Sequence, residues 1–282
     1  MGGNPAHPSQ DFAADSLRPR VRVRLVPTSL DEIPLWLTGL ILFVFFSVVA
    51  MLARALARKR LSESTQEEVE THAQRMITGF AAAFAFFTGV AITMTWGALS
   101  AGQTAVEDLT AKSQQVGWAI GNLSNEAEAD KLQQALTAYL QAVTTADVPY
   151  LASGQTSNLP SDESMDKLQD AIHAYAYAPN TPSSESTALV SSVQALGTSN
   201  STLAAVAERA MPGLMGALLL LVGTLLSATV GLSSLTVTRP VLAILWCLVI
   251  ALSISLVLAL DHPFGGSVTV NLQPLIDVAN SS

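Results

Sequence analysis

Acidic, basic and histidine side chains are missing from the four long apolar runs of this 282-residue chain. Ion-coupled transporters place such residues inside their spans as proton or ion relays, so the absence argues against that class of protein. Cysteine is nearly absent as well. The single thiol, Cys247, cannot form an intrachain disulfide and has no second thiol for a metal site. We therefore expect Cys247 to be a small apolar packing residue.

Signatures of catalysis are also lacking. The chain has no glycine-rich phosphate loop, no zinc-binding His-Glu helix motif and no Gly-x-Ser-x-Gly elbow. Its four histidines are scattered: His7, His72, His173 and His262. The net charge of −8 argues against binding to nucleic acid. We expect no enzyme activity, no cofactor, no metal site and no nucleic-acid partner.

The chain does contain apolar runs of about 20 residues each, long enough to cross a bilayer as helices of about 30 Å. They cover residues 34–53, 76–99, 213–235 and 241–260. A water-soluble protein of this length has no core large enough to enclose four helices that are apolar on every side. The sequence therefore predicts a multi-pass protein whose first partner is the lipid bilayer.

Basic residues near the spans predict the orientation, because loops rich in Lys and Arg stay in the cytoplasm. The loop between the first two spans carries Arg54, Arg58, Lys59, Arg60 and Arg75. These residues predict that this loop is cytoplasmic. The opposite orientation is favoured by four arginines in the tail before the first span, which lie farther from a span: Arg18, Arg20, Arg22 and Arg24. We give the adjacent loop more weight. Residues 100–212 and both termini are then expected outside the cytoplasm.

Residues 100–212 are a polar stretch whose apolar residues recur at steps of three and four, as on one buried helical face. The four stripes are Val106, Leu109, Val116 and Ile120; Leu132, Leu136, Tyr139 and Val143; Met165, Leu168, Ile172 and Tyr175; and Leu189, Val193, Leu196 and Leu203. We expect spans two and three to continue outside the bilayer as long helices that carry two shorter ones, and we call this domain the stalk. The stripes either close a bundle within one chain or pack against copies of the chain. Their narrowness favours packing against copies.

The expected fold is an all-α membrane protein with four transmembrane helices in two pairs and the stalk between spans two and three. Its segments are a largely disordered tail at 1–33, a first helix pair at 34–99, the stalk at 100–212, a second pair at 213–260 and a terminal segment at 261–282. Alternating apolar residues also predict short β-strands at 20–26 and 268–272. Because both strands fall on one side of the membrane, we expect them to pair.

Small residues crowd spans two and three, which lets helix backbones approach closely within lipid. These spans also carry hydroxyl residues that could line a pore in an assembly of several chains. The pore-lining candidates are Thr88, Thr93, Thr95, Ser227 and Thr229. The alternative interpretation is packing inside one four-span bundle. Trp36 and Trp96, near the ends of spans one and two, are expected to anchor the chain at the membrane interface.

A specific motif follows the last span, where proline and paired glycines stop the helix at the membrane surface. Its residues are Leu260, Asp261, His262, Pro263, Phe264, Gly265 and Gly266. The motif resembles the Leu-Asp-Arg-Pro-Phe-Ser-Gly sequence of the bacterial bestrophin-like membrane proteins of unknown function, with His262 in place of the arginine and Gly265 in place of the serine. The end of span two also matches that family, through Trp96 and the pair Val106 and Glu107.

The resemblance covers nearly all of the chain after the tail. It implies a multi-pass protein of the bacterial plasma membrane and a likeness to the anion-channel bestrophins. Replacement of the family arginine by His262 removes a permanent charge from the membrane surface.

Two functional hypotheses remain. The first is an oligomeric ion channel, a homo-oligomer with pore helices from spans two and three. The second is a non-conducting scaffold or sensor whose stalk binds an envelope partner through residues 100–212. Asp261 then either hydrogen-bonds turn amides where the helix breaks, or attracts cations at a pore mouth beside His262. We favour the channel.

Overall fold

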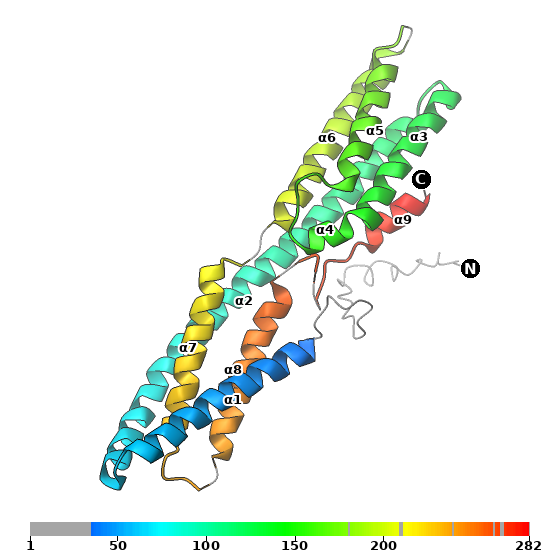
Figure 1. The fold of residues 1–282 in the computed structure, drawn as a ribbon. Helices are drawn as coiled ribbons and strands as arrows, with labels where there is room; N and C mark the ends of the chain where they lie inside the picture. Colours follow the sequence, from blue (N-terminus) through cyan, green and yellow to red (C-terminus); the bar gives the residue numbers. More distant parts are fainter. Residues whose placement is uncertain are drawn as a thin grey trace, which may run out of the picture.

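The chain folds into a long helical structure with its apolar helices at one end and the stalk at the other (Figure 1). The computed structural model describes residues 35–179, 181–208, 211–238, 240–261, 263–265 and 268–281. Four helices are long and apolar enough to cross a membrane: α1 (Leu35–Arg60), α2 (Glu63–Gly121), α7 (Gly213–Leu232) and α8 (Val241–Leu260). The prediction of an all-α membrane protein with four spans in two pairs is confirmed.

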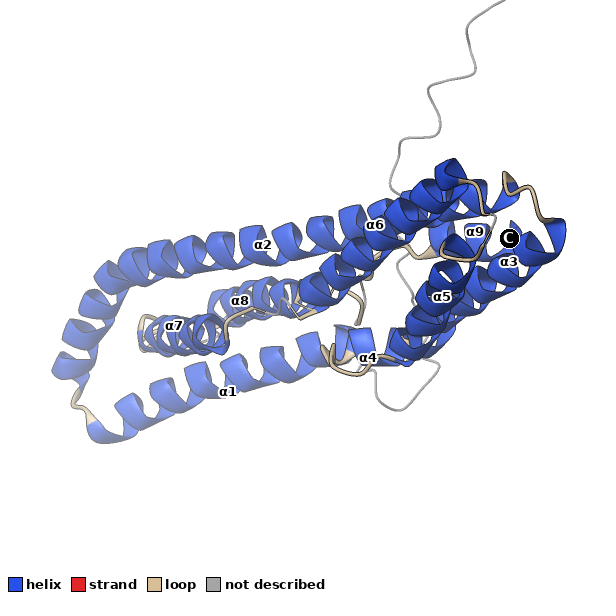
Figure 2. Cartoon of the chain, turned by 90° about the horizontal axis from the view of Figure 1, so that it is seen from above, coloured by secondary structure: helices blue, strands red, loops and turns tan. Residues whose placement is uncertain are grey.

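The membrane helices form layers. Helices α1 and α2 are neighbours in sequence, yet they lie on opposite sides of the pair formed by α7 and α8 (Figure 2). Phe46 of α1, Phe84 of α2, Leu226 of α7 and Ile250 of α8 are buried in the core between them, together with Cys247. Because each outer helix has only one covered side, α1 and α2 present free faces in opposite directions.

Helix α2 connects the membrane part to the stalk without interruption. It has 59 residues, which corresponds to a length of about 90 Å. The predicted extension of span two is therefore found. The predicted extension of span three is not one continuous helix, because helix α6 (Ser183–Ala207) ends before α7 begins at Gly213. Pro212 directly precedes α7, and a proline lacks the N–H that a continuous helix would need there.

The stalk is an intrachain bundle. Besides α2 and α6 it contains α3 (Glu126–Gln141), the π-helical turn η1 (Ala142–Ala146), α4 (Val148–Ala152) and α5 (Pro160–Ala176). Leu109, Leu136, Leu168 and Leu196 come from the four predicted stripes, and all are fully buried in one core. The stripes thus close on one another inside one chain. The favoured packing of these stripes against copies is corrected, because no stripe is left exposed for a second chain.

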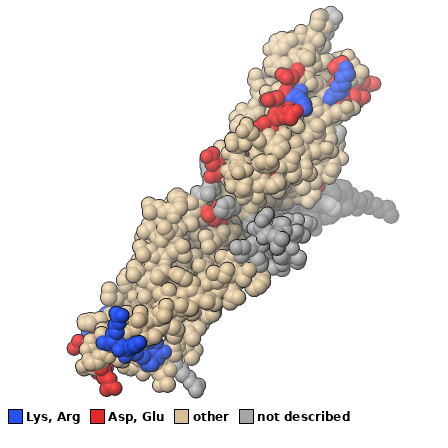
Figure 3. Space-filling view, in the orientation of Figure 1, with Lys and Arg blue, Asp and Glu red and all other residues tan. Residues whose placement is uncertain are grey.

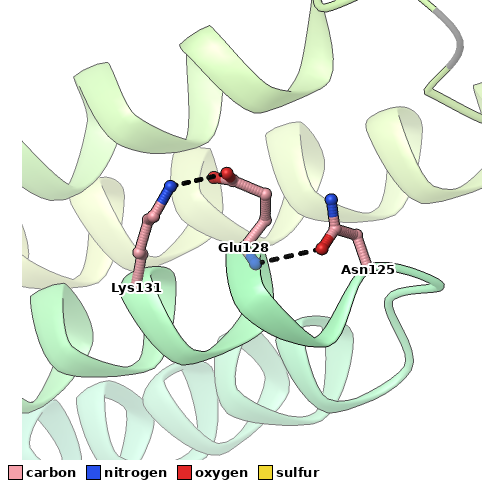
Figure 4. A network of polar contacts seen from close by, with 3 residues as sticks. All are labelled: Asn125, Glu128 and Lys131. Carbon is pink, nitrogen blue, oxygen red and sulfur yellow. Dashed lines mark hydrogen bonds and ion pairs between the residues drawn. The ribbon is translucent and has the colours of Figure 1, made fainter.

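Polar side chains set the starts of the stalk helices. The Asn125 side chain accepts a hydrogen bond from the N–H of Glu128 at 3.4 Å, and the Glu128 carboxylate pairs with Lys131 at 2.7 Å (Figure 4). At the start of α5, the buried Asp147 carboxylate accepts a hydrogen bond from the N–H of Ser161 at 2.9 Å. Both contacts satisfy amide groups that the first turn of a helix leaves free.

The terminal segment lacks the predicted strand at 268–272, and a helix follows that segment. Within the described residues, positions 268–272 contain one bridge residue, Val268, and no strand, while helix α9 follows at Gln273–Ser281. The other predicted strand, 20–26, lies outside the described residues. Leu275, Val278 and Ala279 of α9 are buried against the stalk. Leu275 is followed by apolar residues three and four positions later, which is a helical pattern. The alternation at 268–272 drew the prediction toward a strand instead.

Candidate functional site

The free face of α2 carries exposed polar and small residues on the membrane helices. Its exposed residues include a row at steps of three and four, Ala82, Phe86, Gly89, Thr93, Gly97, Ser100, Thr104 and Asp108, with Trp96 and Met94 beside it. Phe86 is 65% exposed, and Trp96 is 58% exposed. The rest of the row is glycine, alanine, hydroxyl residues and one acid, residue types that suit contact with another helix or with water.

A groove lies on this face where α2 passes from the membrane part into the stalk. It has a volume of about 980 Å³, and α2 and α6 form its walls. The lining residues from α2 include Thr93, Trp96, Gly97, Ser100, Thr104 and Asp108, and those from α6 are Thr202 and Val206. Asp108 is the acid in the lining, and the described residues contribute no Lys or Arg to it.

The five pore-lining candidates from the sequence do not lie together. Thr93 is exposed on the free face of α2, and it lines the groove. Thr95 is buried, and its hydroxyl donates to the carbonyl oxygen of Ala91 at 3.0 Å. Thr88, Ser227 and Thr229 are buried as well, among the helices of the same chain. Of these five residues, Thr93 is the one exposed on the surface of the chain.

Gly97, Ser100, Thr104 and Asp108 were missed by the sequence argument. They follow Thr93 at steps of three and four residues, which places them on the same side of a helix. The signal was present in the sequence, but span two was taken to end at Leu99. The unbroken helix α2 carries the row into the stalk.

The motif after the last span joins three parts of the molecule. The Asp261 carboxylate accepts a hydrogen bond at 2.7 Å from the N–H of Met211, which lies in the linker before α7. The carbonyl oxygen of Pro263 accepts one from the N–H of Val270 at 2.8 Å. Phe264 is buried in the stalk core. Asp261 thus binds an amide from another segment, and the motif connects α8 to the α6–α7 linker.

Two glycines allow this motif to approach its neighbours closely. A Cβ atom on Gly102 of α2 would lie 2.8 Å from Cγ2 of Val270, and one on Gly265 would lie 2.7 Å from the carbonyl oxygen of Ala152 in α4. Both distances are shorter than side chains tolerate. The motif is thus wedged between α2 and α4. His262 and Gly266, the other predicted motif residues, lie outside the described residues.

The two tryptophans predicted as interfacial anchors are exposed. Trp36 lies at the start of α1 with 69% of its surface exposed, and Trp96 of α2 is 58% exposed. Trp36 is in the first turn of α1, whose start lies toward the stalk in Figure 1. Their anchoring role stays a prediction. Trp96 also lines the groove.

At the opposite end of the membrane helices, charged side chains hold the turn between α7 and α8. Arg58 donates to the carbonyl oxygen of Leu235 at 2.7 Å, and the largely buried Arg54 donates to that of Val237. The Glu70 carboxylate of α2 accepts a hydrogen bond from the N–H of Thr236 at 2.9 Å. Three side chains from two helices thus fix one turn.

Comparison with known proteins identifies relatives of this architecture. A family model described as a Bestrophin-like domain matches residues 44–275. The structure resembles crystal structures of single-residue variants of a bacterial bestrophin homologue from Klebsiella pneumoniae. One has a TM-score of 0.62 at 12% identity and covers 88% of this chain and 95% of that chain. Another has a TM-score of 0.62 at 14% identity, and the match covers 86% of this chain and 94% of that chain. Among curated proteins, none matches this chain.

Proposed function

This chain belongs to the bestrophin-like family, and on that premise we propose that it assembles into an oligomeric ion channel with the free face of α2 along the pore. The observation that carries the proposal is the exposed row of small and hydroxyl residues from Ala82 to Asp108. Hydroxyl groups and helix backbone exposed by glycine give ions a weakly polar path.

The layered arrangement of the helices supports a ring with α2 inside. The free face of α1 carries large apolar side chains such as Phe45 and Leu52, which suit contact with lipid tails. The free face of α2 points the other way, on the far side of α7 and α8. Copies arranged around an axis with α2 inward would expose α1 to the bilayer. The groove beside Ser100 and Asp108 then opens toward the axis, where the stalk meets the membrane part.

The first test is the mass and symmetry of the detergent- or nanodisc-solubilised complex. A ring of four or more chains around an open axis is expected. A monomer or a tightly packed dimer would contradict the channel. It would leave the second hypothesis, a non-conducting scaffold or sensor that binds an envelope partner through residues 100–212.

The second test is conduction through reconstituted protein in planar bilayers. Ser100→Cys places a thiol in the proposed pore, and we expect a charged thiol reagent to change the current. Val48→Cys is the matched control, because Val48 is exposed on the free face of α1. The native Cys247 is buried. Absence of current, or an equal effect of the reagent on both variants, would contradict the proposal.

We extend the proposal to orientation in the bacterial plasma membrane, with the stalk and both termini outside the cytoplasm. The basic residues that follow the first span support it. Trp118 is 71% exposed on the stalk part of α2, so Trp118→Cys provides a site for a membrane-impermeant maleimide. Labelling in intact cells is expected. Labelling only after the membrane is permeabilised would reverse the orientation.

A further inference from the structure

Helix α1 carries an apolar stripe on its free face. Ile41, Phe45, Val48, Leu52 and Leu56 are each 47–55% exposed, and they recur at steps of three and four residues, so they share one side of the helix. Lys59 follows Leu56 by three residues and continues the same row. The stripe therefore ends in a cation.

Lipid, rather than a second copy of the chain, fits this stripe. Its side chains are large and branched or aromatic, whereas helices that associate within a bilayer present small residues to each other. The small-residue face in this protein belongs to α2, on the other side of α7 and α8. Contact between copies through α2 would leave the stripe on α1 exposed to acyl chains.

The length of α1 places its last turns among lipid head groups. The helix has 26 residues, or about 39 Å, which exceeds a hydrocarbon core of about 30 Å by roughly two turns. Arg58, Lys59 and Arg60 occupy the last turn. Long basic side chains at this depth extend toward the phosphate layer.

The cations at this end divide into two groups. Arg54 and Arg58 donate hydrogen bonds to the carbonyl oxygens of the α7–α8 turn. Lys59 and Arg60 are exposed, and neither donates a hydrogen bond or forms an ion pair among the described residues. Three acids follow nearby in sequence, Glu63, Glu67 and Glu68. None forms an ion pair with them, since both ion pairs among the described residues lie in the stalk.

We propose that Lys59 and Arg60 bind the phosphate of an anionic phospholipid whose acyl chain lies along Leu56 and Leu52. Lys and Arg side chains gather at the end of the molecule opposite the stalk, with acidic side chains beside them (Figure 3). Leu52 lies about 10 Å from Lys59 along the helix axis, so one lipid molecule spans the cations and the apolar row. The cations provide the preference for an anionic head group, and the leucines provide contact with the tail.

The test is native mass spectrometry of the full chain in detergent, titrated with phosphatidylglycerol and, separately, with phosphatidylcholine. We expect tighter binding of phosphatidylglycerol. Each cation near a lipid surface contributes about fivefold in affinity, so Lys59→Gln with Arg60→Gln should weaken phosphatidylglycerol binding about 25-fold. Lys59→Arg with Arg60→Lys keeps both charges and should retain it.

Three further arms of this experiment separate the sources of binding. Lys112→Gln with Lys131→Gln removes the same charge from the stalk and should leave lipid binding unchanged. Leu52→Ala with Leu56→Ala should weaken the binding of both lipids, because the contact with the acyl chain is lost. Excess inorganic phosphate should not displace the bound lipid, because phosphate lacks the tail.

Equal binding of the two lipids would overturn the proposal. It would also fail if phosphatidylglycerol binding were unchanged in the Lys59→Gln, Arg60→Gln variant, or if inorganic phosphate competed as well as the lipid did. None of these readouts depends on conduction, so this proposal and the proposed channel stand or fall separately.

Discussion

Gly231 of α7 lies directly against the backbone of Ala50 in α1, so close that a Cβ atom on Gly231 would overlap the carbonyl group of Ala50. The two helices therefore touch backbone to backbone at this point, as membrane helices do where a glycine allows it. The contact fixes α1 against α7 near the charged turn.

Gly231→Ala should destabilise the membrane part by about 1–3 kcal/mol or more, because the clash is with backbone and cannot be relieved by a rotamer change. Thermal unfolding in detergent would measure the effect. Gly213→Ala, on the same helix, adds a methyl group that meets nothing within 4 Å. Equal stability of the two variants would show that the close approach has no energetic consequence.

Sequence periodicity predicted the helices better than it predicted their partners. The stripes through Leu136, Leu168 and Leu196 show which residues share a face, and all three are buried. Periodicity does not show which neighbour covers that face, so closure within one chain and contacts between copies both stayed open, with copies favoured. The intrachain closure depends on α3 and α5 folding back beside α2 and α6, which requires contacts distant in sequence.

The candidate site shows the same limit. Thr93 and Thr95 are two residues apart on one helix, so they point to different sides. The sequence gives no reason to prefer one as a pore residue, because only the position of α7 and α8 decides that Thr95 is covered and Thr93 is free. The break before α7 could have been read from Pro212, and α9 from the spacing of Leu275, Val278 and Ala279.

Asp261→Ala should lower stability by about 1.5–3 kcal/mol, because the Met211 N–H loses a charged acceptor at a partly buried position. Asp261→Asn retains an acceptor oxygen and should cost less. Thermal unfolding of the full chain in detergent would compare them. Asp277→Ala, at an exposed position on α9, serves as the control and should change stability by no more than about 0.5 kcal/mol. The same loss in the Ala and Asn variants would contradict the role given to this hydrogen bond.

Gly102 and Val270 should be energetically coupled. Gly102→Ala brings a methyl group to 2.8 Å from Cγ2 of Val270, which should cost about 1–3 kcal/mol. Val270→Ala removes the clashing group. The double variant should therefore be more stable than the sum of the single changes predicts, by an interaction energy of about 0.5–3 kcal/mol. Additive losses in a double-mutant cycle would show that the two residues do not share this contact.

Phe86 should form the narrowest apolar part of the proposed pore. It is 65% exposed on the part of the free face of α2 that lies within the membrane span, and apolar constrictions gate pores by excluding water. Phe86→Ala should increase single-channel conductance in bilayer recordings. Phe45→Ala, on the free face of α1, is the matched control and should leave conductance unchanged. An effect of the same size in both variants would place Phe86 outside the pore.

The Asp147 carboxylate should make stability depend on pH in the acidic range. Burial raises its pKa above the ordinary value, although the hydrogen bond from Ser161 favours the charged form. Buried Tyr139 lies near it, and burial together with the Asp147 charge raises the pKa of that phenol. A carboxyl whose pKa is higher in the folded state binds its proton more readily there than in the unfolded chain. Its charge therefore opposes folding at neutral pH. The cost decreases as the pH falls through the folded-state pKa, and it vanishes below the pKa of the unfolded chain.

Asp147→Asn keeps an oxygen acceptor for Ser161 and removes the charge, so it should raise the unfolding temperature at pH 7. The difference in unfolding temperature between the variant and the native chain should shrink as the pH approaches about 4, the ordinary pKa of aspartate. At that pH the native carboxyl also loses its charge, because it is protonated. Thermal unfolding measured across this range gives both observations. Asp170→Asn removes an exposed carboxylate from α5 and should show no such convergence. A variant that is less stable than the native chain at pH 7 would mean that the charge itself, held at the start of α5, contributes more to folding than its burial costs.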